Sequence, residues 1–371
     1  MFLRTMGRRV RLWCPWRGLV QIGLLQLHPE SVLARLEAAV ILPHGDFALD
    51  PTLVPANTIE RQAADEVAQA AAEVGDWLGH HIDPDLIYLS TPHGIALSNN
   101  FALYLGSTAS GGADIGKDLH NSTVRPYHVN LPRIELEPRL SSELVSELTS
   151  LHLNVSGIQV SAENSFDTPL QWAEVIPLLL IPPRQRRQTY EPPGDASLWS
   201  TTKVHRHLKE RAVSTSQRRH LILSHPLRRY TASPDMVPEL VQLGRLLRRW
   251  LDARPEKITI VISGDMSHTH RADGPYGYSD QSAVFDQAVG VWAADPCRQA
   301  AALLGHARSL QPQALSCGFT GMVMLHGILC SNDDNTAATA HGAVLEWDAH
   351  VWANRNVTYY GMMVASYERI H

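Results

Sequence analysis

Residues 257–268 read Lys-Ile-Thr-Ile-Val-Ile-Ser-Gly-Asp-Met-Ser-His, which is the clearest strand signal in the chain. A short run of apolar and β-branched residues that ends at a polar turn is typical of a buried strand. Glycine and aspartate directly after the run indicate a tight turn at the end of that strand. The segment therefore predicts a strand over residues 257–263 and a turn that carries His268.

Two earlier segments follow the same plan. Residues 39–42 are Ala-Val-Ile-Leu and are closed by Pro-His-Gly, which places His44 in the turn. Residues 85–90 are Asp-Leu-Ile-Tyr-Leu-Ser and are closed by Thr-Pro-His-Gly, which places His93 in the turn. Between them, residues 58–78 have apolar side chains at helical spacing. Strand, helix and strand in this order predict a βαβ unit with parallel strands.

The rest of the chain continues the alternation of strands and helices. Further strands are predicted at residues 151–160 and 220–223, and further helices at residues 237–251, 284–294, 298–304 and 319–329. We therefore expect an α/β fold with three layers, in which a mostly parallel central sheet carries helices on both faces. An additional antiparallel element is compatible with this pattern.

The predicted domain spans residues 38–371, preceded by an N-terminal extension over residues 1–37. The start of this extension is rich in arginine, and no acidic residue occurs before Glu30. Such a composition fits an organelle-targeting segment, or a poorly ordered extension of a cytoplasmic protein. Residues 182–217 contain several prolines and arginines with little apolar periodicity, and they predict an exposed, flexible insertion.

The composition excludes several classes of protein. The chain of 371 residues is 44% hydrophobic and 19% charged, which is ordinary for a globular protein. A formal charge of -5 gives no general attraction to nucleic acid, and no apolar run is long enough to span a membrane. The four cysteines are far apart and form no Cys-x-x-Cys pair, so we expect reduced thiols in an intracellular protein.

The three histidines that follow strands predict a functional site. In open α/β sheets, ligands bind beyond the carboxyl ends of the strands, and parallel neighbours would bring His44, His93 and His268 to one edge. Two neutral imidazoles and one anionic ligand form the facial arrangement that leaves positions open on Fe(II). One histidine at a strand end is more often structural, but three in the same context indicate a metal or acid–base site.

These motifs resemble those of the class III extradiol ring-cleavage dioxygenases, the LigB-like superfamily. The matching segments are residues 40–46 (Val-Ile-Leu-Pro-His-Gly-Asp), 89–95 (Leu-Ser-Thr-Pro-His-Gly-Ile), 263–270 (Ser-Gly-Asp-Met-Ser-His-Thr-His) and 274–278 (Gly-Pro-Tyr-Gly-Tyr). The resemblance covers most of the chain beyond the extension, and the last two segments are its most specific part. It is closest to an uncharacterised branch between catechol dioxygenases and Memo-like proteins.

The resemblance implies roles for four residues. His44 and His93 would be metal ligands. His268 would be the acid–base residue that helps to deprotonate a catechol and then protonates an oxygenated intermediate, because an imidazole has a pKa suited to that work. Asp265 lies one turn before His268 and would either orient it or cap the turn.

The third metal ligand departs from the family pattern. Ring-cleaving members use a glutamate well beyond the catalytic histidine, whereas residues 311–319 contain no carboxylate. Memo-like proteins have a cysteine in the comparable place, which makes Cys317 the candidate ligand. A thiolate ligand suits Cu(I) or Zn(II) as well as Fe(II). The alternative is that Cys317 is a small buried apolar residue.

Four more residues near the motifs are candidates for substrate binding. Tyr276 and Tyr278 would line the pocket or pack within their turn. His270 would contact the substrate or lie at the surface. Asp46 would fix the tautomer of His44 or act as a simple turn residue.

Two functions are predicted, with a third as a weaker alternative. The first is a dioxygenase that uses Fe(II), or else Cu or Zn, to open a small aromatic diol with O2. The second is a Memo-like protein that binds a metal or a peptide without cleaving rings, and the presence of Cys317 favours it. The third is a zinc hydrolase. Class III enzymes often pair, so a homodimer is expected.

Overall fold

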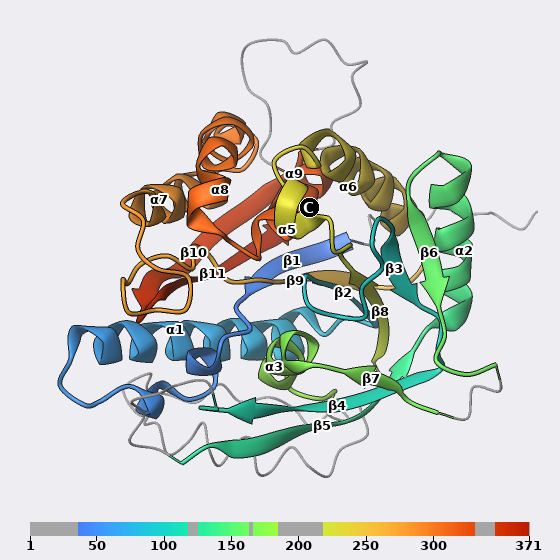
Figure 1. Cartoon of the computed structure of the whole chain (residues 1–371). Helices are drawn as coiled ribbons and strands as arrows, with labels where there is room; N and C mark the ends of the chain where they lie inside the picture. Colours follow the sequence, from blue (N-terminus) through green and yellow to red (C-terminus); the bar gives the residue numbers. More distant parts are fainter. Residues whose placement is uncertain (1–35, 118–124, 163–165, 185–217, 331–345, 371) are drawn as a thin grey trace, which may run out of the picture. The chain divides into compact units, whose positions relative to one another are not determined.

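The computed structural model describes residues 36–117, 125–162, 166–184, 218–330 and 346–370 (Figure 1). All of them belong to one unit of the chain, Ala34–His371. The predicted extension lies outside the described residues up to residue 35, and the predicted insertion does so from residue 185 onward.

Strands and helices alternate along the described part of the chain. The strands are β1 (Leu36–Leu42), β2 (Leu86–Thr91), β3 (Phe101–Tyr104), β4 (Thr108–Ile115), β5 (Tyr127–Leu136), β6 (Val155–Ile158), β7 (Thr168–Leu170), β8 (Arg219–Ser224), β9 (Ile258–Ser263), β10 (Trp347–Val357) and β11 (Tyr360–Arg369). The helices are α1 (Ile59–Asp76), α2 (Pro138–Ser150), α3 (Trp172–Leu180), α5 (Arg229–Ala232), α6 (Val237–Asp252), α7 (Gln281–Ala294), α8 (Arg308–Ala314) and α9 (Phe319–Leu329). Within these ranges, no helix is long and apolar enough to cross a membrane.

The sheet is mixed, with more antiparallel pairing than the sequence predicted. Its strand order is β10-β11-β1-β9-β2-β8-β5-β4-β7, and β3 pairs with β8 and β6 beside this path. The central strands β1, β9, β2 and β8 are parallel neighbours. In contrast, β11 is antiparallel to both β10 and β1, and β4 is antiparallel to β5. The α/β class is therefore correct, whereas a mostly parallel sheet understates its antiparallel flanks.

Both faces of the central strands are buried against helices. Ile260 and Ile262 of β9 pack in the core cluster that includes residues of α6 and α9, whereas Val261 packs in the cluster that includes residues of α1 and α3. Figure 1 shows these two pairs of helices on opposite sides of β9. Strands buried on both faces are apolar without alternation, as the sequence of β9 is. The ends of the strands are thus left to form the site.

The carboxyl ends of the central strands are level with one another. Leu42 of β1 pairs with Ser263 of β9, and Ser90 of β2 pairs with Ile262 of β9. The turns after these three strands therefore start at the same edge of the sheet. This register fulfils the geometric condition for the three histidines to meet.

Two elements differ locally from the sequence prediction. The strand predicted over residues 151–160 is limited to β6, because α2 continues to Ser150 and His152 then adopts a left-handed turn with φ of 63°. The helix predicted over residues 298–304 is instead a π-helical turn, Ala302–Ala307, that leads into α8. In both cases the apolar pattern is present, but the connection to the preceding helix determines where the element begins.

A disulfide corrects the expectation of reduced thiols. Cys297, exposed after α7, is bonded to Cys330 at the end of α9, with their Cα atoms 5.4 Å apart. The two cysteines are separated by 33 residues in the sequence, so their pairing depends on how α7 and α9 pack and not on a local motif. Cys317 is the free cysteine of the described residues.

Replacing both disulfide cysteines by serine is expected to destabilise the fold. Closing a loop of this length removes conformational entropy from the unfolded chain, which stabilises the folded state by about 3 to 4 kcal/mol. The midpoint of thermal unfolding of Cys297→Ser/Cys330→Ser should fall by several degrees, and wild type measured with a reductant should match it. Equal midpoints for oxidised wild type and the double variant would contradict the bond.

Candidate metal centre

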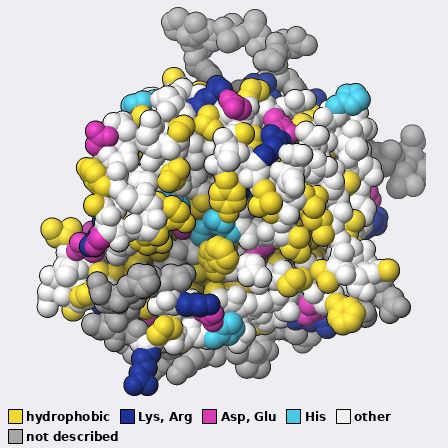
Figure 2. All heavy atoms as spheres, viewed as in Figure 1, with side chains coloured by type: hydrophobic (Ala, Val, Ile, Leu, Met, Phe, Trp, Pro, Cys, Tyr) yellow, Lys and Arg dark blue, Asp and Glu magenta, His cyan; other side chains and the backbone are white. Residues whose placement is uncertain are grey.

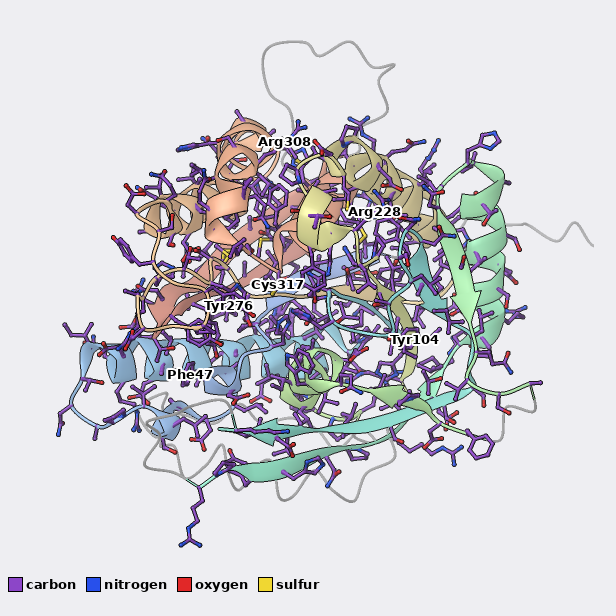
Figure 3. The ribbon with its side chains drawn as sticks, in the orientation of Figure 1. Phe47, Tyr104, Arg228, Tyr276, Arg308 and Cys317 are labelled. Carbon is purple, nitrogen blue, oxygen red and sulfur yellow. A yellow bond between two sulfur atoms is a disulfide. The ribbon has the colours of Figure 1, made fainter. Side chains whose placement is uncertain are left out.

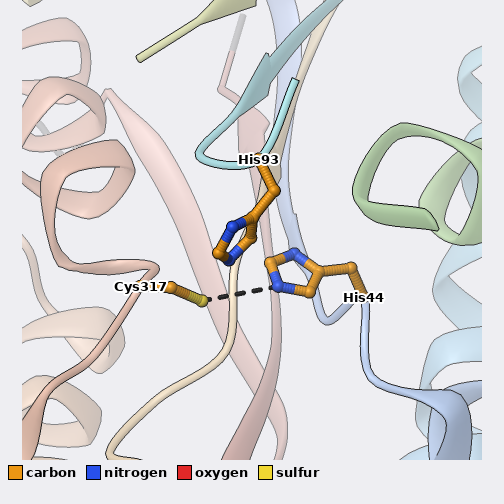
Figure 4. A group of neighbouring side chains, drawn as sticks. All are labelled: His44, His93 and Cys317. Atoms are coloured by element: carbon orange, nitrogen blue, oxygen red, sulfur yellow. Dashed lines mark hydrogen bonds between the residues drawn. The ribbon is translucent and has the colours of Figure 1, made fainter. Parts of the chain in front are cut away.

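Three predicted residues, His44, His93 and Cys317, converge at the edge of the sheet (Figure 4). Pro43 and Pro92 connect β1 and β2 directly to the two histidines. Cys317 approaches from the turn before α9. The potential ligand atoms of the three residues all lie within 4.8 Å of one another.

The distance between His44 and Cys317 fits a shared metal ion. The Nε2 atom of His44 lies 3.4 Å from the Sγ atom of Cys317. Ligands at about 2.0 Å for nitrogen and 2.3 Å for sulfur lie about 3.5 Å apart in a tetrahedral site. The rings of His44 and His93 meet edge to face, with centroids 5.1 Å apart. A second group that could hold a metal shares Cys317 and adds Asp265 and His268.

Burial keeps the histidines neutral. It lowers the pKa of His44 well below its ordinary value, and the neighbouring His93 and His268 lower it further. The pKa of His93 falls to about 3 through burial and the nearby Arg229, and that of His268 falls to about 4, mainly through burial. A neutral imidazole has one nitrogen lone pair at pH 7, which a metal ligand or a general base requires. In His93, the Nδ1 atom faces a donor, the Nη2–H of Arg229, at 3.2 Å.

Cys317 is a protonated thiol in the absence of a metal ion. The residue is only 7% exposed, and burial raises the pKa of its thiol to about 12, with Asp265 acting in the same direction. The Sγ atom also accepts a hydrogen bond from the backbone N–H of Asp265, at 3.3 Å. A metal ion would have to displace the thiol proton, because the thiolate is the ligand form.

Asp265 contacts His44, which precedes it by 221 residues in the sequence. Its Oδ1 atom accepts a hydrogen bond from the backbone N–H of His44, at 3.2 Å, and its Oδ2 atom lies 3.3 Å from Nε2 of the same residue. Among the hydrogen bonds of the described residues, none joins Asp265 to His268. Burial raises the pKa of Asp265 to about 7. The carboxyl group therefore holds the turn after β1 beside the turn after β9, as a cap would.

His268 is held in place by its backbone and by aromatic rings. Its backbone N–H donates to the carbonyl of Ala314, at 2.8 Å. The imidazole stacks on Tyr360, with centroids 5.8 Å apart and planes 14° from parallel, and it meets Tyr276 edge to face. The Nδ1 atom is buried, and no described residue gives it a well-aligned hydrogen bond. The other ring nitrogen is therefore the one available to a bound molecule.

A cavity of about 460 Å³ opens over these residues. Of the predicted metal-binding and catalytic residues, His44, His93, Asp265 and His268 line it, whereas Cys317 is not part of the lining. Aromatic rings and polar side chains form the rest of the wall, among them Trp172, Tyr276, Tyr359, Tyr360, Asp114, Lys117, His128 and Gln171. Figure 2 shows histidine in the middle of this face with hydrophobic side chains around it, and Figure 3 shows Tyr276 and Cys317 in the same central region. The space suits a ligand of aromatic size.

The predicted substrate-binding residues divide into two groups. Tyr276 and Asp46 line the cavity. His270 and Tyr278 are outside its lining, because His270 pairs with the buried Asp286 at 2.7 Å and Tyr278 is 66% exposed. The two residues are joined by an antiparallel backbone bridge.

Asp46 does not have the predicted contact with the ring of His44. Its Oδ2 atom accepts a hydrogen bond from the backbone N–H of Gly116, at 2.7 Å. The Nδ1 atom of His44 instead lies 2.8 Å from the Oγ atom of Ser263, the last residue of β9. Nothing in the sequence distinguishes Ser263 from any other strand-end serine, so the pattern could not reveal this contact.

Arg229 is a site residue that the sequence pattern missed. Its Nε atom donates to the carbonyl of Pro92 at 2.8 Å, and its Nη2 atom lies 3.2 Å from Nδ1 of His93. The guanidinium is buried and lies on the short helix α5. The signal that could have found it is His225, which follows β8 directly as the other histidines follow their strands. Its ring contacts Ser90, at 2.8 Å, and it is not part of the cavity lining.

Glu174 is a buried carboxyl group behind the turn of His93. Its Oε1 atom accepts from the hydroxyl of Tyr104, at 2.8 Å, and its Oε2 atom accepts from the backbone N–H of Gln171, at 2.8 Å. Tyr104 in turn accepts from the backbone N–H of Ile95, at 2.7 Å. These contacts connect α3 to the turn that carries His93. Burial raises the pKa of Glu174 to about 7.

This raised pKa predicts that Glu174 makes stability depend on pH. In the unfolded chain the carboxyl ionises near about 4.3, so the folded state binds more protons between that pH and about 7. The contribution of Glu174 to the free energy of unfolding is fully present below this window and falls as the pH rises through it, by up to about 4 kcal/mol. The urea-unfolding free energy of Glu174→Gln should decrease less than that of wild type between pH 5 and pH 8. The same decrease in both proteins would contradict the assignment.

Comparisons with known proteins do not assign the chain to a family. No family model matches it, and no curated protein matches it. It is similar to the crystal structure of the uncharacterized protein JW3007 from Escherichia coli K12, with 14% sequence identity and a TM-score of 0.45. The match covers 89% of this chain and 99% of the other. At this level the similarity carries no argument about function.

Proposed function

We propose that this protein is a metal-dependent dioxygenase that opens the ring of a small aromatic diol with O2. The observation that carries the proposal is the convergence of His44, His93 and Cys317, two of which line the same cavity as His268. A metal-ligand set and a neutral base are both needed for such a reaction, and they lie side by side. The resemblance to class III extradiol dioxygenases suggests the same chemistry.

The two imidazoles and the thiol suit a metal ion that accepts both nitrogen and sulfur ligands. His44, His93 and Cys317 would hold the ion, and two imidazoles with one thiolate are compatible with Fe(II), Zn(II) or copper. When bound, the metal would bring both substrate oxygens and O2 into one coordination sphere. Fe(II) is the metal we propose, because ring opening by O2 needs a redox-active ion.

The protein's own residues would supply the proton transfer and the binding of the ring. His268 is neutral at pH 7 and is positioned to take the proton of a substrate hydroxyl and to return it later. Trp172, Tyr276 and Tyr359 offer ring faces and edges against which an aromatic substrate can pack. Their packing would also exclude water from the reacting atoms.

A second candidate is a Memo-like metal-binding protein without ring-cleavage activity. The observation that favours it is Cys317, which occupies the place where ring-cleaving enzymes have a glutamate. A thiolate donates more electron density and is more easily oxidised than a carboxylate. In this reading the same residues bind a metal, but His268 has no substrate hydroxyl to deprotonate.

The two candidates differ in one experiment. The protein is loaded with Fe(II) without oxygen, mixed with a panel of catechols, and then exposed to O2. Oxygen uptake with a yellow ring-fission product is expected for the dioxygenase. Tight metal binding that His44→Ala abolishes, without product from any catechol, would reject ring cleavage and favour the second candidate.

A further inference from the structure

Ser263 connects the ring of His44 to a backbone carbonyl of helix α3. Its side chain is 1% exposed at the end of β9. The Oγ atom lies 2.8 Å from Nδ1 of His44 and 2.5 Å from the carbonyl oxygen of Ala173. The hydroxyl thus stands between a ring nitrogen and an oxygen atom that can only accept.

The carbonyl of Ala173 is available because of a proline in the same helix. In an α-helix, that carbonyl would accept from the backbone N–H four residues later. The residue there is Pro177, which has no N–H to donate. The carbonyl of Ala173 therefore needs another donor, and the hydroxyl of Ser263 is in place to provide it.

The directions of these hydrogen bonds determine where the proton of His44 lies. The hydroxyl of Ser263 has one hydrogen, which it donates to Ala173. Toward Nδ1 of His44, the hydroxyl can then only accept, so Nδ1 must carry the hydrogen. A neutral imidazole has one N–H, and Nε2 is left with its lone pair, 3.4 Å from the sulfur of Cys317.

We propose that Ser263 is a positioning residue that fixes the tautomer of His44 with Nε2 free to bind a metal ion. This inference rests on the proposed metal centre of His44, His93 and Cys317. It gives Ser263 the task that the sequence had suggested for Asp46. Groups that orient a ligating histidine in this way raise metal affinity by about 10- to 100-fold.

Without the hydroxyl, the other tautomer becomes favourable. In Ser263→Ala the buried Nδ1–H of His44 has no acceptor, which is costly. A hydrogen on Nε2 can instead be donated to Oδ2 of Asp265, at 3.3 Å, or to the sulfur of Cys317, at 3.4 Å. That hydrogen occupies the atom that a metal ion would bind.

The first test observes the tautomer in the metal-free protein. Histidine side chains are labelled with nitrogen-15, and the signal of His44 is assigned by its loss in His44→Gln. The proton on Nδ1 in wild type and on Nε2, or shared, in Ser263→Ala is the expected result. A proton on Nε2 in wild type, or no change in Ser263→Ala, would overturn the proposal. This readout does not depend on whether the protein binds a metal.

The second test measures Zn(II) affinity by competition with a chelator. Ser263→Ala should bind about 10- to 100-fold more weakly than wild type, and Ser263→Thr, which keeps a hydroxyl, should recover most of the affinity. Ser224→Ala is the matched control, since Ser224 is a fully buried serine at the end of β8, which is separated from β9 by β2. Wild-type affinity in Ser263→Ala would reject the positioning role. Equal affinity of wild type and His44→Ala would reject the metal centre itself, while the nitrogen-15 result would still decide the tautomer.

Discussion

In the Fe(II)-loaded protein, His268→Ala is expected to cleave an aromatic diol about 10²- to 10⁴-fold more slowly than wild type. His268 lines the cavity together with His44 and His93, and its Nδ1 atom is buried, so Nε2 is the nitrogen that a substrate would reach. Burial, with His270 and Arg229 acting in the same direction, lowers the pKa of His268 to about 4, so the base is unprotonated throughout the neutral range. Wild-type activity should therefore not fall between pH 8 and pH 6 through protonation of this residue.

The metal content of His268→Ala shows whether the variant has lost only the base or also the metal site. His268→Ala should retain bound Fe(II), because the proposed ligands are His44, His93 and Cys317. His350→Ala serves as a control, since His350 lies on β10 away from the cavity lining. Wild-type oxygen uptake in His268→Ala with full metal content would remove His268 from the mechanism.

Cys317→Ala is expected to weaken Zn(II) binding more than any change outside the ligand set, by about 100-fold or more at neutral pH. The thiol has a pKa of about 12, whereas His44 and His93 are already neutral. Metal binding to wild type therefore releases the thiol proton. Above pH 7.5, where Asp265 is ionised, wild-type affinity should rise about tenfold for each unit of pH. In Cys317→Ala this rise should disappear.

The neighbouring Ser316 provides a control for this variant. It is also buried, and its hydroxyl donates to the carbonyl of Asp265, at 2.9 Å, without facing the ligand atoms. Ser316→Ala should keep both the affinity of wild type and its pH dependence. A Cys317→Ala protein that retains that pH dependence would show that another group releases the proton, and Cys317 would then be a buried apolar residue.

The sequence predicts the centre of the site because the relevant signal is local. A buried strand followed by Pro-His-Gly is visible in the sequence alone, and parallel neighbours in register must bring such turns together. His44 and His93 were placed by this argument. Cys317 was placed by resemblance, because its approach from the turn before α9 depends on the packing of the whole helix.

The parts that could not be predicted depend on contacts between distant segments. Arg229 reaches His93 across 136 positions of the sequence, and Ser263 reaches Ala173 across 90. The contact of His270 with the buried Asp286 likewise joins residues whose proximity the sequence pattern does not reveal. The antiparallel strand β10 was missed because its sequence mixes apolar and polar residues without a regular period, and only Trp347, Ala353 and Val357 are buried.

The measurement that tests the metal centre most directly is the X-ray absorption spectrum of the Zn(II)-loaded protein. We expect two imidazole nitrogens at about 2.0 to 2.1 Å and one sulfur at about 2.3 Å from the metal. In Cys317→Ala the sulfur should be lost, and in His44→Ala the protein should no longer bind Zn(II) tightly. A wild-type spectrum without a sulfur ligand, or a protein that binds no Zn(II), would contradict the metal centre of His44, His93 and Cys317.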